Sequence, residues 1–311
     1  MDPALQPLRR IAAYGICVSP ADNTLLVRAA PHAANPGAWS LPGGGVHHGE
    51  HPEAAVVREI ADETGLDVEV VELRDVLSDL RALPDRGLAL HTDRLLYAVR
   101  VTGGDLCSAT QGSTDMARWM TSDEARRSAL RPFTAHALGL EAEHADLCPE
   151  EPPELPSFLL LPGPDGRPRA QRFAAYAVAT DPGQRVLLTR VSDGYPGAGR
   201  WHLPGGGIDF GENPGSALMR ELTEETGQRG RLIALLGVAS HRDAAQVGPE
   251  GYPIDWHGIR AFYRVLVDEP VPPRVYDAHG STCEARWFAR GEVDGLPLTE
   301  VTLEALARAE L

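Results

Sequence analysis

The 311-residue chain contains the same order of segments twice, and this repeat constrains its fold more than any other feature. Residues 10–14 (RIAAY) return as residues 172–176 (RFAAY), and residues 39–45 (WSLPGGG) return as residues 201–207 (WHLPGGG), each 162 positions later. Further along, the separation grows to 168 for residues 112–119, so the second copy carries small insertions that are expected to lie in loops. Because the period is as long as a domain, the sequence predicts two copies of one domain, not a solenoid of short modules.

A proline-rich stretch separates the two copies. Seven prolines between Glu141 and Pro168 disfavour both helix and central strand, which predicts a stiff connector. Within it, residues 158–161 (FLLL) are expected to pack on one domain as an edge strand. We therefore predict a first domain at residues 1–140, a linker at residues 141–168 and a second domain at residues 169–311.

Within each copy the hydrophobic pattern predicts strands, then a glycine-rich loop, a helix, further strands and a closing helix. The predicted strands are residues 11–18, 24–28 and 94–101 in the first copy and residues 173–179, 185–190 and 259–267 in the second. The closing helices are predicted at residues 122–130 and 300–310. Mixed strands with few helices favour layers of helix packed against sheet.

The charge composition narrows the chemistry that is available. All 29 basic residues are arginine, and 44 acidic residues bring the net charge to −15. The absence of lysine excludes a phosphate-binding P-loop, a Schiff base and a Ser-Lys dyad. The acidic excess disfavours a nucleic-acid partner held through its phosphates. Any phosphate must then be bound by arginine, by backbone N–H groups or by a metal ion.

Two further patterns concern the compartment. No apolar run approaches the length of a membrane span, and the first ten residues lack the apolar core of a secretory signal. The four cysteines form no CxxC pair, which favours reduced thiols. We expect a soluble, cytoplasmic protein with no membrane partner.

The most informative segment is the acidic stretch at residues 211–227 of the second copy. Asn213 is a good N-cap, Pro214 suits the first helical position and Gly227 suits the residue after the last turn. These signals predict a helix of about 13 residues.

Three carboxylates share one face of this helix. Glu221, Glu224 and Glu225 stand at positions i, i+3 and i+4, where like charges repel, so a positive charge is expected among them. Ligands that are all oxygen favour a hard cation, Mg²⁺ or Mn²⁺. A solvated acidic surface is the ordinary meaning of such a cluster. The duplication argues against it, because each copy places the cluster nine residues beyond a Gly-Glu step and behind Leu-Pro-Gly-Gly.

The spacing Gly206, Glu212 and residues 220–227 (RELTEETG) resembles the box of the Nudix hydrolase family. The first copy resembles it through Gly44, Glu50 and residues 58–65 (REIADETG). The resemblance covers both domains and implies the α+β class, with two tandem Nudix folds, each an α/β/α sandwich around a mixed β-sheet. It also implies Mg²⁺-dependent hydrolysis of a diphosphate bond that joins a nucleoside to another group, which is pyrophosphohydrolase chemistry on a phosphoric anhydride.

The same resemblance implies roles for individual residues. The implied metal ligands are Glu212, Glu221, Glu224 and Glu225, and in the first copy Glu50, Glu59, Asp62 and Glu63. The implied catalytic set is Glu221, Glu224, Glu225, Glu284 and Arg220, with Glu59, Glu63 and Arg58 in the first copy. Within these sets, Arg220 and Arg58 are expected to orient a box carboxylate through a bidentate pair.

Substrate contacts are implied at two further pairs of positions. Arg190 and Arg28 each end the second strand of their copy and are similar to a position that meets substrate phosphates, although a surface arginine is an equally good interpretation. Gly206 and Gly44 let the backbone approach metal and phosphate closely.

The two copies are unequal. Asp62 stands where the family has glutamate, and Met116 stands where the second copy has Glu284, an acid that binds metal or acts as a base in many members. Gln228 replaces a usually apolar residue, which concerns packing and not the metal. These differences favour the second copy as the better-formed site.

Three alternatives stay open. The chain could be a nucleotide-binding sensor without turnover, or the first domain could be a degenerate partner of a catalytic second domain. A tandem chain could also form an intramolecular pseudo-dimer or a homodimer. The substrate is expected to be a small nucleoside diphosphate derivative, whose identity the sequence leaves undetermined.

Overall fold

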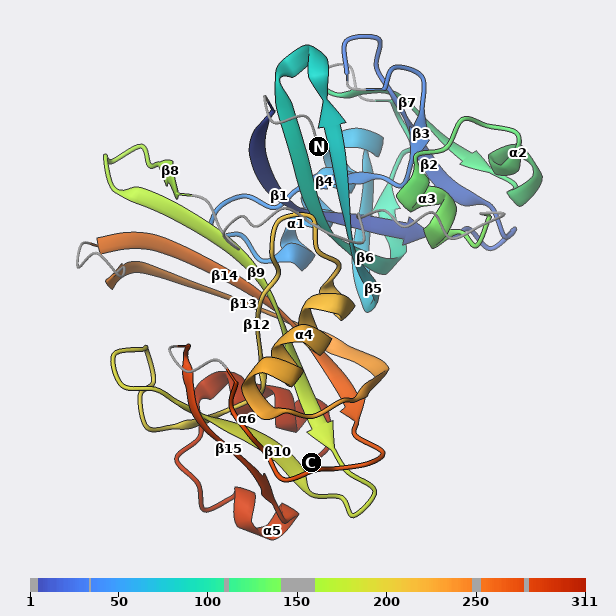
Figure 1. Cartoon of the computed structure of the whole chain (residues 1–311). Coiled ribbons are helices and arrows are strands. Elements are labelled where there is room, and N and C mark those ends of the chain that lie inside the picture. The colour runs from blue at the N-terminus through green and yellow to red at the C-terminus, as the bar shows by residue number, and fades with distance from the viewer. Residues whose placement is uncertain (1–4, 34, 109–111, 141–159, 248–252, 277–279) are drawn as a thin grey trace. The chain divides into compact units, whose positions relative to one another are not determined.

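The computed structural model describes residues 5–33, 35–108, 112–140, 160–247, 253–276 and 280–311 (Figure 1). Contacts within the chain divide it into two compact units, Met1–Pro153 and Glu154–Leu311, and each is considered separately. No described helix is long and apolar enough to cross a membrane.

The first unit builds two small sheets beside its helices. Its elements are β1 (Gln6–Cys17), β2 (Thr24–Ala29), β3 (Trp39–Ser40), β4 (Gly43–Gly45), α1 (Pro52–Thr64), β5 (Leu66–Leu83), η1 (Pro84–Arg86), β6 (Leu88–Gly104), β7 (Thr114–Met120), α2 (Ser122–Arg126) and α3 (Pro132–Ala137). One sheet has the order β4-β1-β6-β5 and the other the order β3-β2-β7. Strands β1 and β6 are parallel whereas the other pairs are antiparallel, so the sheet is mixed.

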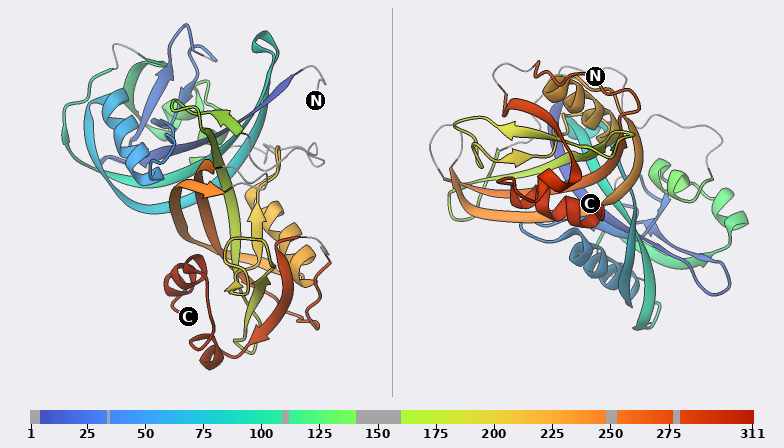
Figure 2. Two further views of the ribbon diagram at one scale, coloured as in Figure 1. Left: turned by 90° about the vertical axis from the view of Figure 1, so that its left-hand side faces the viewer. Right: turned by 90° about the horizontal axis from the view of Figure 1, so that it is seen from below.

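The second unit repeats this topology. Its elements are β8 (Leu160–Pro162), β9 (Pro168–Thr180), β10 (Val186–Val191), β11 (Trp201–His202), β12 (Gly205–Gly207), α4 (Pro214–Thr226), β13 (Arg231–Val247), β14 (Pro253–Leu266), β15 (Thr282–Phe288), α5 (Arg290–Val293) and α6 (Glu300–Arg308). Strands β12-β9-β14-β13 correspond to β4-β1-β6-β5, and β11-β10-β15 correspond to β3-β2-β7. The long strands β9, β14 and β13 run side by side (Figures 1 and 2).

Helices cover both faces of the central strands. In β1, a Cβ built on Gly15 would lie 2.5 Å from Ile60 Cδ1 of α1, whereas the ring of Tyr14 packs 4.5 Å from that of Phe133 in α3. Because successive residues of a strand point to opposite faces, α1 and α3 lie on opposite sides of the sheet. In the second unit, Tyr176 likewise belongs to the core cluster that includes Leu306 of α6. The predicted helix–sheet–helix sandwich is confirmed.

The predicted acidic helix is present with the predicted ends. Helix α4 begins after Asn213, whose side chain accepts a hydrogen bond from the Gly215 N–H at 2.9 Å, and Pro214 takes the first position. It ends at Gly227, whose φ of 70° is the left-handed conformation that favours glycine. Leu222 is fully buried, so an apolar stripe of the helix packs on the sheet.

Two predicted features differ in detail. The helix predicted at residues 122–130 ends at Arg126, and a separate helix, α3, follows after Pro132. Proline lacks an N–H and restrains the residue before it, so the segment restarts there instead of continuing. The correct counterpart of α6 is therefore α3, and that of α2 is α5.

The predicted linker is only partly described. Residues 141–159 lie outside the described residues, but β8 pairs antiparallel with the start of β9, with Leu160 opposite Ala170. The edge strand expected near the end of the linker therefore joins the second unit.

Gln228 anchors the chain that follows α4. Its buried side chain donates to the Thr226 and Val271 carbonyl oxygens at 3.1 and 3.0 Å and accepts from the Val271 N–H at 3.0 Å. We expect Gln228→Leu to lower the free energy of unfolding by about 1–2 kcal/mol, because it removes these hydrogen bonds. Urea denaturation of the full chain measures the change, and an unaltered midpoint would contradict this role.

A buried ionic cluster distinguishes the first unit. Asp93 is fully buried and accepts hydrogen bonds from Ser78 Oγ at 2.6 Å, from His91 Nε2 at 2.9 Å and from Arg9 Nη2 at 3.1 Å. Burial alone would raise the pKa of Asp93, but the charges of His91 and Arg9 and the hydrogen bonds hold that pKa well below its usual range. The first unit thus contains an ion pair in its interior.

The second unit has uncharged residues at the positions equivalent to this ionic cluster. Gln171 stands in place of Arg9 and Ile259 in place of Asp93. His257 is hydrogen-bonded to the Gln171 amide at 3.0 Å and to Ser240 Oγ at 2.9 Å. The buried histidine at this position is therefore held by an ionic cluster in the first unit and by neutral hydrogen bonds in the second.

Candidate active site

The glycine-rich loop brings the backbone against the acidic face of α4. Strand β12 pairs with β9, with Gly206 opposite Ala175. A Cβ on Gly206 would lie 2.4 Å from Glu221 Oε1, so only glycine lets this carboxylate rest on the loop. The missing side chain therefore forms a cradle for Glu221.

Glu225 is the most enclosed carboxylate of the site. Its side chain is 6% exposed and accepts hydrogen bonds from the Gly205 N–H at 2.8 Å and from Thr282 Oγ1 at 2.5 Å. Burial raises the pKa of Glu225 to about 7, with a further contribution from the negative charge of Glu221, although the hydrogen bonds oppose the rise. Burial also raises the pKa of Glu221.

Arg220 gathers the other box carboxylates. Its Nε and Nη2 donate to the two oxygens of Glu212 at 3.0 and 2.9 Å, which is the predicted bidentate pair. Its Nη1 donates to Glu221 at 3.1 Å and to Glu224 at 3.2 Å. The positive charge expected among the acids is therefore supplied in part by this arginine, and Glu225 lies outside its reach.

The donor set suits a hard divalent cation. Across the described residues, no three or more His, Cys, Asp or Glu side chains are already gathered as a metal site. Glu221 and Glu225 are nevertheless neighbouring carboxylates whose raised pKa values report buried negative charge that is incompletely compensated. Oxygen ligands of this kind are those that Mg²⁺ and Mn²⁺ prefer. These two residues fit the role of metal ligands.

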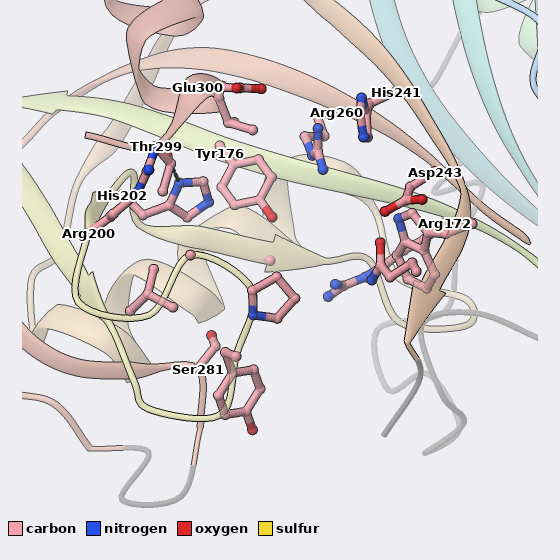
Figure 3. A pocket seen from close by; sticks show the side chains of 18 of the residues that line it. Arg172, Tyr176, Arg200, His202, His241, Asp243, Arg260, Ser281, Thr299 and Glu300 are labelled. Carbon is pink, nitrogen blue, oxygen red and sulfur yellow. Dashed lines mark hydrogen bonds between the residues drawn. The ribbon is translucent and has the colours of Figure 1, made fainter. Parts of the chain in front are cut away.

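A large cavity opens beside this carboxylate pair. Its volume is about 1550 Å³, and Gly205, Gly206 and Glu225 form part of its lining (Figure 3). Other lining residues come from the sheet and include Arg172 and Arg260. The sequence analysis missed these two arginines, although Arg172 lies in the repeated segment that revealed the two copies.

His202 is a second lining residue that the sequence analysis did not select. Its Nδ1 is hydrogen-bonded to Thr299 Oγ1 at 2.7 Å, and its ring meets that of Tyr176 edge to face at 4.9 Å. Burial lowers the pKa of His202 to about 4, and Arg260 adds to the effect. The imidazole is therefore neutral at physiological pH and serves as a hydrogen-bonding wall of the cavity.

Comparison with known proteins places this geometry in a family. The sequence model of the NUDIX domain matches residues 8–138 and again residues 170–308. The chain belongs to the NUDIX family. The matches cover both copies of the repeat, so the predicted tandem arrangement of two NUDIX domains is confirmed.

Individual relatives match shorter parts of the chain. A MutT-like protein of Streptomyces ambofaciens is 32% identical over 118 residues, which are 38% of this chain and 68% of the relative. An ADP-ribose pyrophosphatase of Methanocaldococcus jannaschii is 40% identical over 85 residues, 27% of this chain and 48% of the relative. The chain therefore spans about half the length of that pyrophosphatase. Family and relatives together support a pyrophosphohydrolase.

The MutT NUDIX hydrolase of Burkholderia pseudomallei is 26% identical, with a TM-score of 0.35, and the alignment covers 43% of this chain and 98% of that one.

The first NUDIX domain repeats the box with one difference. Arg58 donates to both oxygens of Glu50 at 2.8 and 2.9 Å and to Glu59 at 2.8 Å, as Arg220 does to Glu212 and Glu221. Among the described residues, however, Asp62 forms no ion pair, whereas its counterpart Glu224 meets the arginine. Asp62 is one methylene shorter than Glu224 and does not reach Arg58.

The buried carboxylate and the glycine cradle are also conserved between the copies. Glu63 accepts from the Gly43 N–H at 2.9 Å, and burial raises the pKa of Glu63 to about 8. A Cβ on Gly44 would lie 2.5 Å from Glu59 Oε2. The first domain thus retains the two carboxylates that would approach a cation.

Arg190 and Glu284 form an ion pair with each other and do not line the cavity. They face each other across β10 and β15, and Arg190 Nη1 lies 3.3 Å from Glu284 Oε2, with both side chains about half exposed. In the first domain Arg28 pairs instead with Asp115 at 2.8 Å, while Met116 takes the position of Glu284. Neither Arg190 nor Glu284 lines the cavity described above, so their predicted roles stay predictions.

Proposed function

We propose that the second NUDIX domain catalyses Mg²⁺-dependent hydrolysis of a diphosphate bond in a nucleoside diphosphate linked to another group. The observation that carries the proposal is the carboxylate pair of partly buried Glu221 and buried Glu225, held against Gly206 and Gly205 at the wall of a cavity of about 1550 Å³. The pair supplies oxygen ligands, and the cavity supplies room for a nucleotide.

Each box residue then has a task. Glu221 and Glu225 would hold the cation, and Arg220 would keep Glu212 and Glu224 oriented beside them. When bound, the cation neutralises charge on the phosphate oxygens and activates a water molecule. The relative named as an ADP-ribose pyrophosphatase supports a substrate in which a nucleoside diphosphate is joined to a second group.

The first domain is proposed to be a degenerate partner. In addition to Asp62 and Met116, its counterpart of the sheet wall is closed by its own side chains: Arg94 is 3% exposed and pairs with Asp79 at 2.8 Å. This observation favours catalysis by the second domain over two equal sites. A pseudo-dimer within one chain, or a homodimer, remains part of this proposal.

A release screen tests the assignment. Phosphate or nucleotide release is measured with Mg²⁺ over nucleotides, nucleotide sugars and dinucleotides, for the wild-type chain and the Glu63→Gln and Glu225→Gln variants. We expect turnover that is lost only in Glu225→Gln. Absence of activity on every substrate would favour a sensor that binds nucleotide without turnover.

A further inference from the structure

One face of three neighbouring strands forms the sheet wall of the second domain's cavity. Arg172 of β9 stands beside Gly258 of β14, and Gly258 stands beside His241 of β13. Arg260 follows Gly258 by two positions and therefore points to the same face. Figure 3 shows the guanidinium groups of Arg172 and Arg260 both directed into the cavity.

Small residues flank Arg260 in the neighbouring strands. Arg260 lies between Ala174 of β9 and Ala239 of β13 in the strand register. A Cβ on Gly258 would make a tight contact of 3.1 Å with Trp256 Nε1 and an ordinary contact of 3.7 Å with Arg260 Nη2. The neighbours of Arg260 in the sheet therefore leave its guanidinium group open to the cavity.

The charge of Arg172 acts on Glu221, where it opposes the rise in the pKa of that carboxyl. Within the described part of the chain, Arg172 and Arg260 form no ion pair, and Arg172 Nε is buried without a hydrogen-bond partner. On the other face of the same strands, by contrast, Arg242 is paired with Asp255 at 2.8 Å. A buried donor without an acceptor is costly, and an anionic ligand in the cavity would supply the missing acceptor.

The first domain provides an internal comparison. Its counterpart of Arg260 is Arg94, which donates to both oxygens of Asp79 at 2.8 and 3.0 Å and lies 4.2 Å from the ring centre of Phe133. Asp79 occupies the register position of His241, and Thr92 that of Gly258. The same cation is therefore neutralised and covered in one domain but left available in the other.

We propose that Arg172 and Arg260 form an anion subsite that binds a phosphate group other than the one held at the Nudix-box carboxylates. The substrates of the second domain are then nucleotides with three or more phosphates, in preference to diphosphates joined to a neutral sugar. Guanidinium groups bind phosphate oxygens in bidentate fashion, and a third phosphate supplies the charge that two arginines require. This inference rests on the proposed function for its catalytic readout.

The first experiment compares kcat/KM for ATP and for ADP-ribose with Mg²⁺. We expect the wild-type chain to prefer ATP, and Arg172→Gln or Arg260→Gln to raise KM for ATP by about 10- to 100-fold but to change ADP-ribose cleavage by less than about threefold. Arg231→Gln, which removes an exposed arginine paired with Asp268 at 2.8 Å, is the matched control and should change neither. Equal losses on both substrates would overturn the subsite.

The second experiment introduces into the second domain the aspartate that pairs with the equivalent arginine in the first domain. His241→Asp should pin Arg260 as Asp79 pins Arg94, and so reproduce the Arg260→Gln effect on ATP. The double variant His241→Asp/Arg260→Gln should be no worse than Arg260→Gln alone, because both changes remove one interaction. Additive losses would contradict the mechanism.

Binding of inorganic tripolyphosphate, measured by calorimetry without added metal, separates the subsite from catalysis. Arg172→Gln and Arg260→Gln should each weaken binding by about 10-fold, while Arg231→Gln should leave it unchanged. If the two variants weaken tripolyphosphate binding but the chain cleaves no substrate, the proposed function is rejected and the anion subsite is kept. Tripolyphosphate binding that is equal in all four proteins would overturn the subsite.

Discussion

Glu225→Gln is expected to reduce turnover on the best substrate of the release screen by about 10³-fold, because the change removes a ligand charge worth several kcal/mol in the transition state. The amide has nearly the shape of the carboxylate and can still accept from the Gly205 N–H. The loss should therefore come from charge and not from misfolding. Steady-state kinetics with Mg²⁺ gives kcat, and a thermal melt of the variant checks the fold.

The chain carries its own control for this variant. Glu63→Gln makes the same change in the first domain, where Glu63 accepts from the Gly43 N–H in the same way. We expect its turnover to stay within about twofold of wild type, because the sheet wall of that domain is closed by the pair of Arg94 and Asp79. Turnover lost in Glu63→Gln and kept in Glu225→Gln would reverse the assignment of the two domains.

Asp93→Asn should destabilise the first domain by about 3–5 kcal/mol, because it leaves the charge of Arg9 without its buried partner. Protonation of Asp93 at low pH should likewise destabilise the wild-type protein. Since the pKa of folded Asp93 lies below its unfolded value, the stabilisation is present above about pH 4 and is lost as the pH falls further. Calorimetry of the full chain between pH 3 and pH 7 should show an acid-sensitive transition that Asp93→Asn makes less sensitive.

The second domain suggests the compensating change. The double variant Arg9→Gln/Asp93→Ile copies Gln171 and Ile259 and should recover most of the lost stability, because it replaces the ion pair with a neutral arrangement. Hydrogen exchange in β1 and β6 would locate the effect in the first domain. A double variant that is less stable than Asp93→Asn would contradict this interpretation.

The sequence predicted the features that are local along the chain. Asn213, Pro214 and Gly227 define α4 because capping depends on residues a few positions apart. The same holds for the shared face of Glu221, Glu224 and Glu225, which follows from helical periodicity. The repeat itself then predicted the number of domains.

The features that depend on strand pairing could not be predicted. Arg172 and Arg260 are 88 positions apart and share a face only because β9 and β14 are parallel neighbours. The pairing of Arg190 with Glu284 and the burial of Asp93 likewise depend on register between distant segments. One signal was present in the sequence: Gly258 stands where the first copy has Thr92, which marks a position where side-chain volume is removed.

Hydrolysis in ¹⁸O-labelled water is the most direct test of the central claim, that the second domain directs water to phosphorus in a cation-dependent reaction. The best substrate of the release screen is incubated with Mg²⁺ and the full chain, and the products are analysed by mass spectrometry. The account predicts one ¹⁸O atom on a phosphate product, and no cleavage with a chelator or in Glu225→Gln. Cleavage that persists without a divalent cation, or label found only on the group that was joined to the phosphate, would contradict it.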